Sequence, residues 1–104
     1  MAWFYLILAG LFEIMWAIGL KYSDGFSKLW PSVGTVLAMA LSLWCLGLSV
    51  KTVPIGTGYA VWTGIGVTGT AILGMFLFEE SSDVQKIVSI AAIVVGIVGL
   101  KLSS

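Results

Sequence analysis

An acidic side chain lies in the middle of an almost wholly apolar stretch near the beginning of the sequence. The stretch reads AGLFEIMWAIGLK, residues 9–21, and its carboxylate belongs to Glu13. In a helix that enters a bilayer near Trp3, Glu13 is roughly 15 Å deep, close to the midplane of a hydrocarbon layer about 30 Å thick. An ionised carboxylate there costs several kcal/mol, so Glu13 is the first candidate for a functional group. The alternative is a protonated acid that only makes a hydrogen bond between helices.

The chemistry that suits such a carboxyl group is the exchange of a proton for a cation. Burial disfavours the charged form of a carboxyl group, and a second carboxylate nearby disfavours it further. Two copies of Glu13 that shared one site would therefore hold protons and release them when a cation arrived. The position of Glu13 thus predicts proton-coupled exchange.

Small and aromatic side chains share the helical face of Glu13. Gly10, one turn before it, has no side chain, which leaves room for another helix or a small ligand. Trp16, one turn after it, offers a ring face and one N–H donor. The alternative for Trp16 is the aromatic belt at a membrane surface.

A second aromatic face appears in YAVWTGIG, residues 59–66. Aromatic faces attract cations, and phenol and indole groups can donate hydrogen bonds to a carboxylate. An aromatic belt or plain helix packing would also explain these residues. Gly64 and Gly66 could let helices approach closely, or let this helix bend as alternating access requires. The residues on one face of this stretch are Tyr59, Trp62, Thr63 and Gly66.

Two further stretches carry small side chains of interest. Ser42 is a central hydroxyl that either faces the site or hydrogen-bonds to its own helix. Near the end of the chain, Ala92, Gly96 and Gly99 recur at helical spacing. Such a stripe allows two membrane helices to approach closely, so we interpret it as a dimer contact. The alternative is packing within one chain.

The elements that must position these residues are membrane-spanning helices. The chain is 60% hydrophobic and 10% charged with a mean hydropathy of +1.11, whereas a soluble domain carries about 25% charged residues. We therefore predict an all-α integral membrane protein that forms a single membrane domain over residues 1–104. Ser27 is expected to cap the second helix, and Ser82 with Gln85 to form a capping box for the fourth. The four transmembrane helices are expected at about 3–20, 30–50, 56–78 and 83–102.

Residue types that the sequence lacks exclude several classes of protein. It has no histidine, no arginine and a single cysteine, Cys45. Neither a disulfide nor a Cys/His metal site can form within one chain, and we expect no cofactor. The five lysines leave no basic patch for a nucleic acid. No nucleophile and base pair is apparent, so the chain is not expected to be an enzyme.

The lysines also leave the orientation in the membrane nearly undetermined. Lys51 and Lys101 fall on one side, and Lys21, Lys28 and Lys86 fall on the other. This near balance gives the positive-inside rule little to act on. Either one orientation is weakly preferred, or the chain inserts both ways and two opposite copies pair. An antiparallel pair would supply the symmetry that larger transporters encode as an inverted repeat.

Several segments together resemble the small multidrug resistance family of bacterial proton-coupled exporters. Besides Glu13, they are PIGTGYAVWTGIG (54–66), GFSKLWPSVGT (25–35) and GLK (99–101). Within that family, EIMWAIGLKYS (13–23) looks like the guanidinium exporter branch, because Trp16 stands where the multidrug branch usually has a small residue.

The resemblance implies an antiparallel, dual-topology homodimer whose two Glu13 carboxylates bind either protons or one cation. It implies that Trp16, Ser42, Tyr59 and Trp62 line the site. The helix with Ala92, Gly96 and Gly99 would form much of the dimer contact, and Gly64 and Gly66 a flexible point.

The expected function is therefore proton-coupled export of guanidinium and small substituted guanidinium cations across the bacterial inner membrane. The expected partners are the cation, protons, a second copy of the chain and the lipid bilayer. Two alternatives stay open: an exporter of quaternary ammonium or polyaromatic cations, and a membrane subunit that does not transport.

Overall fold

The computed structural model describes residues 2–103, and within them it is entirely helical. Each of its four helices is long and apolar enough to cross a membrane. The predicted all-α class with four potential membrane spans is therefore confirmed. The helices are α1 (Ala2–Ser23), α2 (Leu29–Ser49), α3 (Ile55–Leu77) and α4 (Val84–Ser103).

The first helix runs three residues past its expected end at Leu20, because Ser23 completes its last turn. The Ser23 hydroxyl donates to the carbonyl of Leu20 at 2.9 Å and accepts from the N–H of Phe26 at 3.1 Å. The chain then turns through Asp24, Gly25 and Phe26, which have φ values of 51°, 70° and 69°. These left-handed conformations end α1.

Both predicted helix caps are wrong. Lys28, in an extended conformation, precedes α2 and makes no side-chain cap bond. The Ser27 hydroxyl instead donates to the carbonyl of Ser23 at 3.3 Å. At α4 the cap is Asp83 rather than Ser82, because its Oδ1 accepts from the N–H of Lys86 at 2.9 Å. A carboxylate at this position also interacts favourably with the helix dipole.

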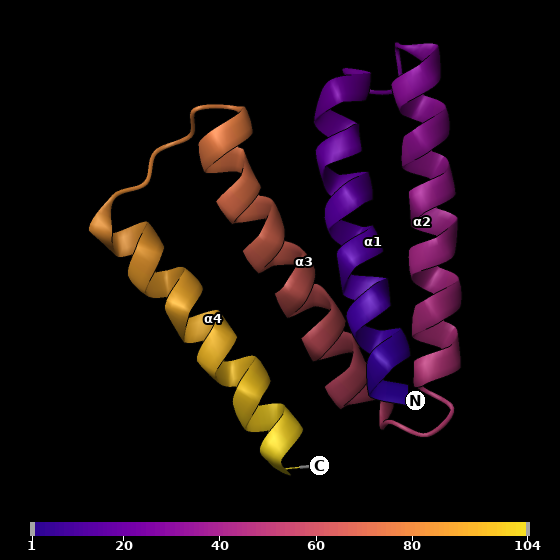
Figure 1. The fold of residues 1–104 in the computed structure, drawn as a ribbon, viewed down its shortest axis with the longest axis vertical. Helices are drawn as coiled ribbons and strands as arrows, with labels where there is room; N and C mark the ends of the chain where they lie inside the picture. The colour runs from indigo at the N-terminus through magenta and orange to yellow at the C-terminus, as the bar shows by residue number, and fades with distance from the viewer. Residues whose placement is uncertain (1, 104) are drawn as a thin grey trace.

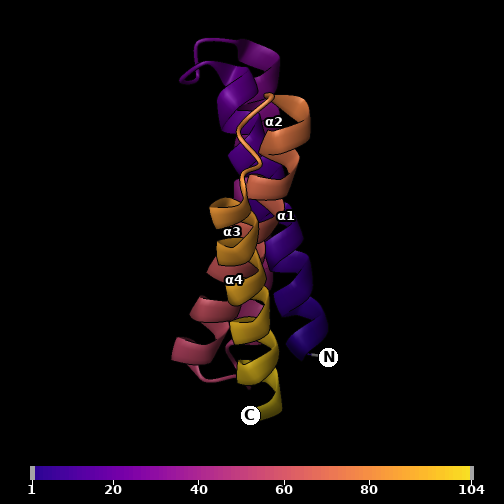
Figure 2. The ribbon, with the colours of Figure 1, turned by 90° about the vertical axis from the view of Figure 1, so that its left-hand side faces the viewer.

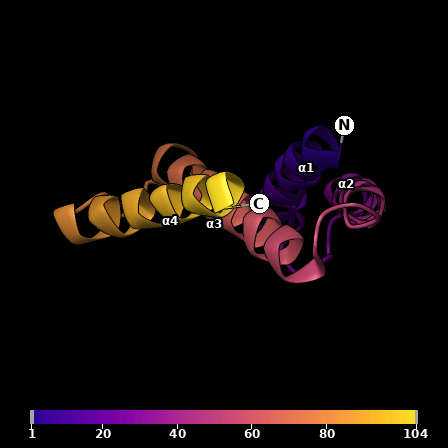
Figure 3. The same cartoon turned by 90° about the horizontal axis from the view of Figure 1, so that it is seen from below.

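The helices form a flattened array in the order α4, α3, α1 and α2, so that α3 and α1 are the two inner helices (Figure 1). Within residues 2–103, α1 packs against α2 and α3, while α4 packs against α3 alone. The molecule measures 40 × 34 × 16 Å, and its narrow edge is visible in Figures 2 and 3. α1 and α3 run in the same direction and separate toward the end that carries the loops after α1 and α3 (Figure 1).

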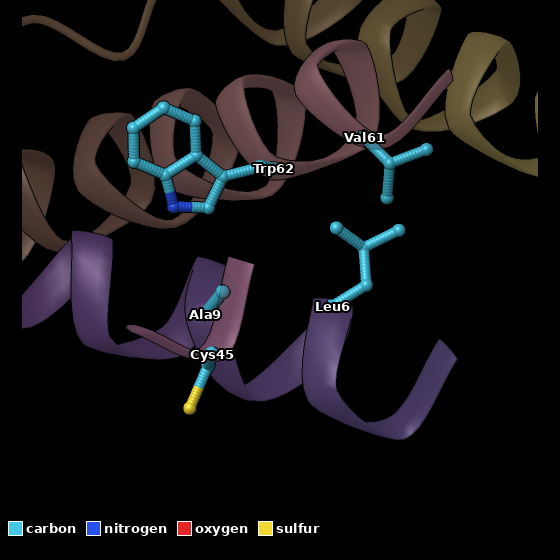
Figure 4. Close-up of a cluster of buried hydrophobic side chains, with 5 residues drawn as sticks. All are labelled: Leu6, Ala9, Cys45, Val61 and Trp62. Carbon is cyan, nitrogen blue, oxygen red and sulfur yellow. The ribbon is translucent and has the colours of Figure 1, made fainter. Parts of the chain in front are cut away.

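The buried core lies where α1, α2 and α3 meet (Figure 4). Its two most deeply buried large side chains are Leu6 and Val61, which are 0% and 1% exposed. No described residue of α4 is buried, so that helix presents most of its apolar surface outward. The core members drawn in the close-up are Leu6, Ala9, Cys45, Val61 and Trp62.

Candidate functional site

The side chain of Glu13 lies against a glycine of α3. A Cβ atom placed on Gly66 would overlap the Glu13 carboxylate, and Gly66 itself is buried. A larger residue at this position would force the Glu13 side chain out of its present position. The glycine therefore has a direct packing role here, namely to admit a carboxyl group between α1 and α3.

Glu13 opens onto a groove between α1 and α3 with a volume of about 500 Å³. It follows the side on which the two helices separate in Figure 1. Glu13 and Trp16 line it from α1, and Gly66 and Thr70 line it from α3. The remaining lining residues are Ala17, Ile18, Lys21, Val67, Ala71, Gly74, Phe78, Glu80 and Lys86.

Three polar atoms in this groove are buried and have no hydrogen-bond partner among the described residues. They are Oε1 of Glu13, Nε1 of Trp16 and Oγ1 of Thr70. Such atoms are unusual, because most buried polar groups in proteins are paired. The groove thus offers a carboxylate acceptor, an indole donor and a hydroxyl that can do both.

Charged side chains stand at the open end of the groove. Lys86 Nζ lies 3.4 Å from Glu80 Oε1 and forms an exposed ion pair. Lys21 Nζ lies 5.8 Å from the centre of the Phe78 ring. Glu80 is therefore paired with a lysine, whereas Glu13 forms no ion pair with any of the described residues. Within residues 2–103, no three His, Cys, Asp or Glu side chains are grouped to hold a metal.

Ser42 and Trp62 form a hydrogen-bonded link between three helices. Trp62 Nε1 donates to Ser42 Oγ at 2.9 Å, and Ser42 Oγ donates to the carbonyl of Ala9 at 2.7 Å. Ser42 is fully buried and bonds to α1 rather than to its own helix, so the alternative of back-bonding is wrong. The link reaches α1 one turn before Glu13 and does not include its carboxylate.

The other residues predicted for the site are not among the residues that line the groove. Tyr59 is 57% exposed, and the centre of its ring is 5.6 Å from that of the Trp62 ring. The hydroxyl of Thr63 is buried without a partner among the described residues. The space at Gly10 is filled by Ile65 of α3, whose Cβ would lie 2.7 Å from an added Cβ.

The small residues of α4 face away from the rest of the chain. Ala92, Gly96 and Gly99 are exposed, and a Cβ on either glycine would meet no atom within 4 Å. The contact with α3 is made instead by Ile97, whose Cδ1 would lie 2.8 Å from a Cβ on Gly64. The alternative that this stripe packs within one chain is therefore wrong for the described residues.

Thr70 is the groove residue that the sequence analysis did not single out. It lies four residues after Gly66 and so continues the face of Tyr59, Trp62, Thr63 and Gly66 by one more turn. This helical spacing could have indicated Thr70 as a site residue. A threonine in a membrane helix usually hydrogen-bonds to the backbone of its own helix, however, so its presence alone does not indicate a site.

Comparison with known proteins identifies one family, whose model matches nearly the whole chain. The family model for Small Multidrug Resistance proteins matches residues 1–93. The chain belongs to this family. Proteins named Guanidinium exporter are similar along their full length: that of Yersinia pseudotuberculosis is 57% identical over 104 residues, which is 100% of each chain. Those of Escherichia coli K12 and Proteus vulgaris are 54% and 52% identical over 100% of this chain and 99% and 100% of their own.

Membership in the Small Multidrug Resistance family makes the four apolar helices the spans of a multi-pass transporter in the bacterial inner membrane. It also gives the unpartnered oxygen of Glu13 a setting of low dielectric constant. In such a setting an interaction between charges is stronger than in water, and an unpaired charge is more costly.

The Ser42 link generates a prediction on stability. Ser42→Ala would leave the buried N–H of Trp62 unpaired, which costs about 1–3 kcal/mol of unfolding free energy. Trp62→Phe removes that donor, so the double variant should lose less than the sum of the two single losses. The measurement is denaturant unfolding of all four proteins in detergent, followed by circular dichroism. Strictly additive losses would show that the two side chains are not coupled.

Proposed function

We propose that this chain exports guanidinium and small substituted guanidinium cations across the bacterial inner membrane in exchange for protons, with Glu13 as the group that binds both. The observation that carries this proposal is the unpartnered Glu13 oxygen in a groove shared with an indole and a hydroxyl. Full-length relatives with 52–57% identity that are named Guanidinium exporter support the choice of cation.

The chemistry of guanidinium fits the groups in the groove. The ion is planar, carries N–H donors in a fork that matches a carboxylate, and stacks on aromatic faces. Glu13 would supply the charge and the acceptors, and Trp16 a ring face beside them. A quaternary ammonium ion has no N–H to give, so it would leave the polar groups of the groove unpaired.

Coupling follows because the proton and the cation compete for the same oxygens. A protonated Glu13 is neutral and does not attract a cation, whereas a deprotonated Glu13 is costly in the membrane until a cation neutralises it. A carrier whose proton-loaded and cation-loaded forms change face, while its empty form does not, exchanges one ligand for the other. Net outward movement of the cation is then driven by protons moving inward.

The functional unit in this proposal is an antiparallel homodimer of two single-domain chains. The flattened shape and the unburied α4 leave a large apolar surface for a second copy. The exposed Ala92, Gly96 and Gly99 would allow two α4 helices to approach closely. The near balance of lysines on the two sides permits opposite insertion. Such a pair would bring two Glu13 side chains to one site.

The remaining site residues have proposed roles in this dimer. Ser42, Tyr59 and Trp62 would line or support the site and hydrogen-bond Glu13 or the cation once the two chains are together. In support, Ser42 and Trp62 are already bonded to each other beside α1. Gly64 and Gly66 would provide the flexible point of α3 when the carrier changes face.

Glu13→Gln is expected to abolish coupled transport while the protein still folds, because the amide neither holds the exchangeable proton nor neutralises a cation. The measurement is guanidinium-driven current in liposomes on a solid-supported membrane, with proton flux followed by a pH-sensitive dye. Glu79→Gln, an exposed acid outside the groove, is the matched control and should transport like the wild type. Proton-coupled uptake that persists in Glu13→Gln would refute the mechanism, because a group other than Glu13 would then couple transport to protons.

Gly96→Leu is expected to weaken the dimer, because a bulky side chain on the stripe would hold two α4 helices apart. The dimer fraction should fall several-fold when it is measured by cross-linking in detergent over a dilution series. Val98→Leu is the control, since Val98 is 52% exposed on α4 but lies outside the small-residue stripe. Equal dimer fractions in the two variants would place the dimer contact elsewhere.

A further inference from the structure

We infer that Thr70 is a substrate-binding residue whose hydroxyl accepts a hydrogen bond from a guanidinium ion held by Glu13. This inference rests on the proposed function and adds a specificity-determining group to it. Neither the pattern of the sequence nor the relatives' names assign a role to Thr70. Three observations carry it: the position of Thr70 in the groove, the unpaired state of its oxygen, and the kinds of donor and acceptor around it.

Thr70 is the next groove-lining position on α3 beyond the point where Glu13 touches that helix. Glu13 contacts Gly66, and Thr70 follows one helical turn later, a rise of roughly 6 Å. Trp16 lines the groove from α1 one turn beyond Glu13, and α1 and α3 run in the same direction. Thr70 and Trp16 therefore flank the segment of groove that a small cation would occupy when it binds the carboxylate from its open side.

The unpaired state of the Thr70 oxygen is not what an ordinary helical threonine shows. On α2, the hydroxyl of Thr35 donates to the carbonyl of Pro31 at 2.7 Å, which is the usual way for a helix to satisfy such a group. Thr70 Oγ1 is buried but has no partner among the described residues. Thr63 Oγ1 and Thr68 Oγ1 are also buried and unpaired, yet neither residue lines the groove. Placement beside Glu13 is thus what distinguishes Thr70.

Among the polar side chains of the groove, Thr70 is suited to accept a hydrogen bond from guanidinium. Guanidinium has N–H donors and no acceptor, so the indole N–H of Trp16 and the ammonium groups of the lysines cannot bond to it. The acceptor side chains in the lining are Glu13, Glu80 and Thr70, and Glu80 is paired with Lys86 at the open end. Once two N–H groups of the ion are bound to Glu13, Thr70 is the remaining side-chain acceptor that this chain places in the lining of the groove away from the ion pair.

A hydroxyl at this position would favour cations with several N–H groups. A site built to hydrogen-bond a substrate N–H discriminates against analogues that lack it, because the buried polar group is then left unpaired. The indole N–H of Trp16 could in turn donate to the hydroxyl oxygen or to Glu13, which would satisfy all three unpaired atoms when the ion is bound. Thr70 would thereby contribute to selection for guanidinium over fully alkylated ammonium ions.

The test compares guanidinium binding to Thr70→Val, Thr70→Ser and Thr68→Val with binding to the wild-type, full-length protein. Valine keeps the shape of threonine and removes the hydroxyl, and serine keeps the hydroxyl. For Thr70→Val, the Kd for guanidinium from isothermal titration in detergent should rise roughly tenfold. The guanidinium concentration that half-saturates transport in proteoliposomes should rise by the same factor. Thr70→Ser should stay within about twofold of the wild type, and Thr68→Val should be unchanged, since it removes an equally buried hydroxyl outside the groove.

The outcomes separate this inference from the function on which it rests. If the wild type transports guanidinium and Thr70→Val binds it equally well, the role of Thr70 is refuted and the proposed function stands. If Thr68→Val weakens binding as much as Thr70→Val, the effect belongs to helix packing and the inference is also refuted. If the wild type does not bind or transport guanidinium, the proposed function itself fails. Should Thr70→Val not fold, Thr70→Ala against Thr70→Ser makes the same comparison, and equal affinities overturn the inference.

Discussion

The contact between the Glu13 carboxyl group and the bare backbone of Gly66 is the constraint on which the rest of the structure depends. A carboxyl group in the middle of a membrane must be neutralised by a proton or by a cation, and the cost of leaving it charged gives the site its chemistry. The glycine lets α3 approach this group closely while both helices stay regular. Beyond that contact the two helices separate, and the space between them is the groove.

The positions of the other helices follow from the need to hold that contact. The link from Trp62 through Ser42 to Ala9 ties α3 and α2 to the part of α1 just before Glu13. The core of Leu6, Val61 and their neighbours lies on the same side, so the packed half of the molecule supports the carboxyl group from one direction. The other half is open, and α4 adds its packing to α3 alone. One chain thus packs its helices tightly on one side and leaves the other side open.

Much of this architecture could be predicted from the sequence, because apolar runs of bilayer length specify membrane helices almost by themselves. The type and depth of Glu13 also singled it out as a candidate, and the structure places it in the lining of the groove. The helix caps were not predictable, because Ser27 and Ser82 compete with Lys28 and Asp83 for positions one residue apart, and local backbone geometry decides between them. The bonding of Ser42 across to α1 and the unpaired oxygen of Thr70 depend on which faces of three helices meet, and periodicity within a single helix does not specify this.

In the proposed mechanism one carboxyl group binds the proton and the cation alternately. The number of protons released when guanidinium binds tests this directly, and it is obtained by isothermal titration of the purified protein in buffers of different ionisation enthalpy. We expect proton release that decreases as the pH is raised and Glu13 is already deprotonated. Guanidinium binding that releases no proton at any pH, from acidic to alkaline, would show that the proton and the cation do not compete for Glu13.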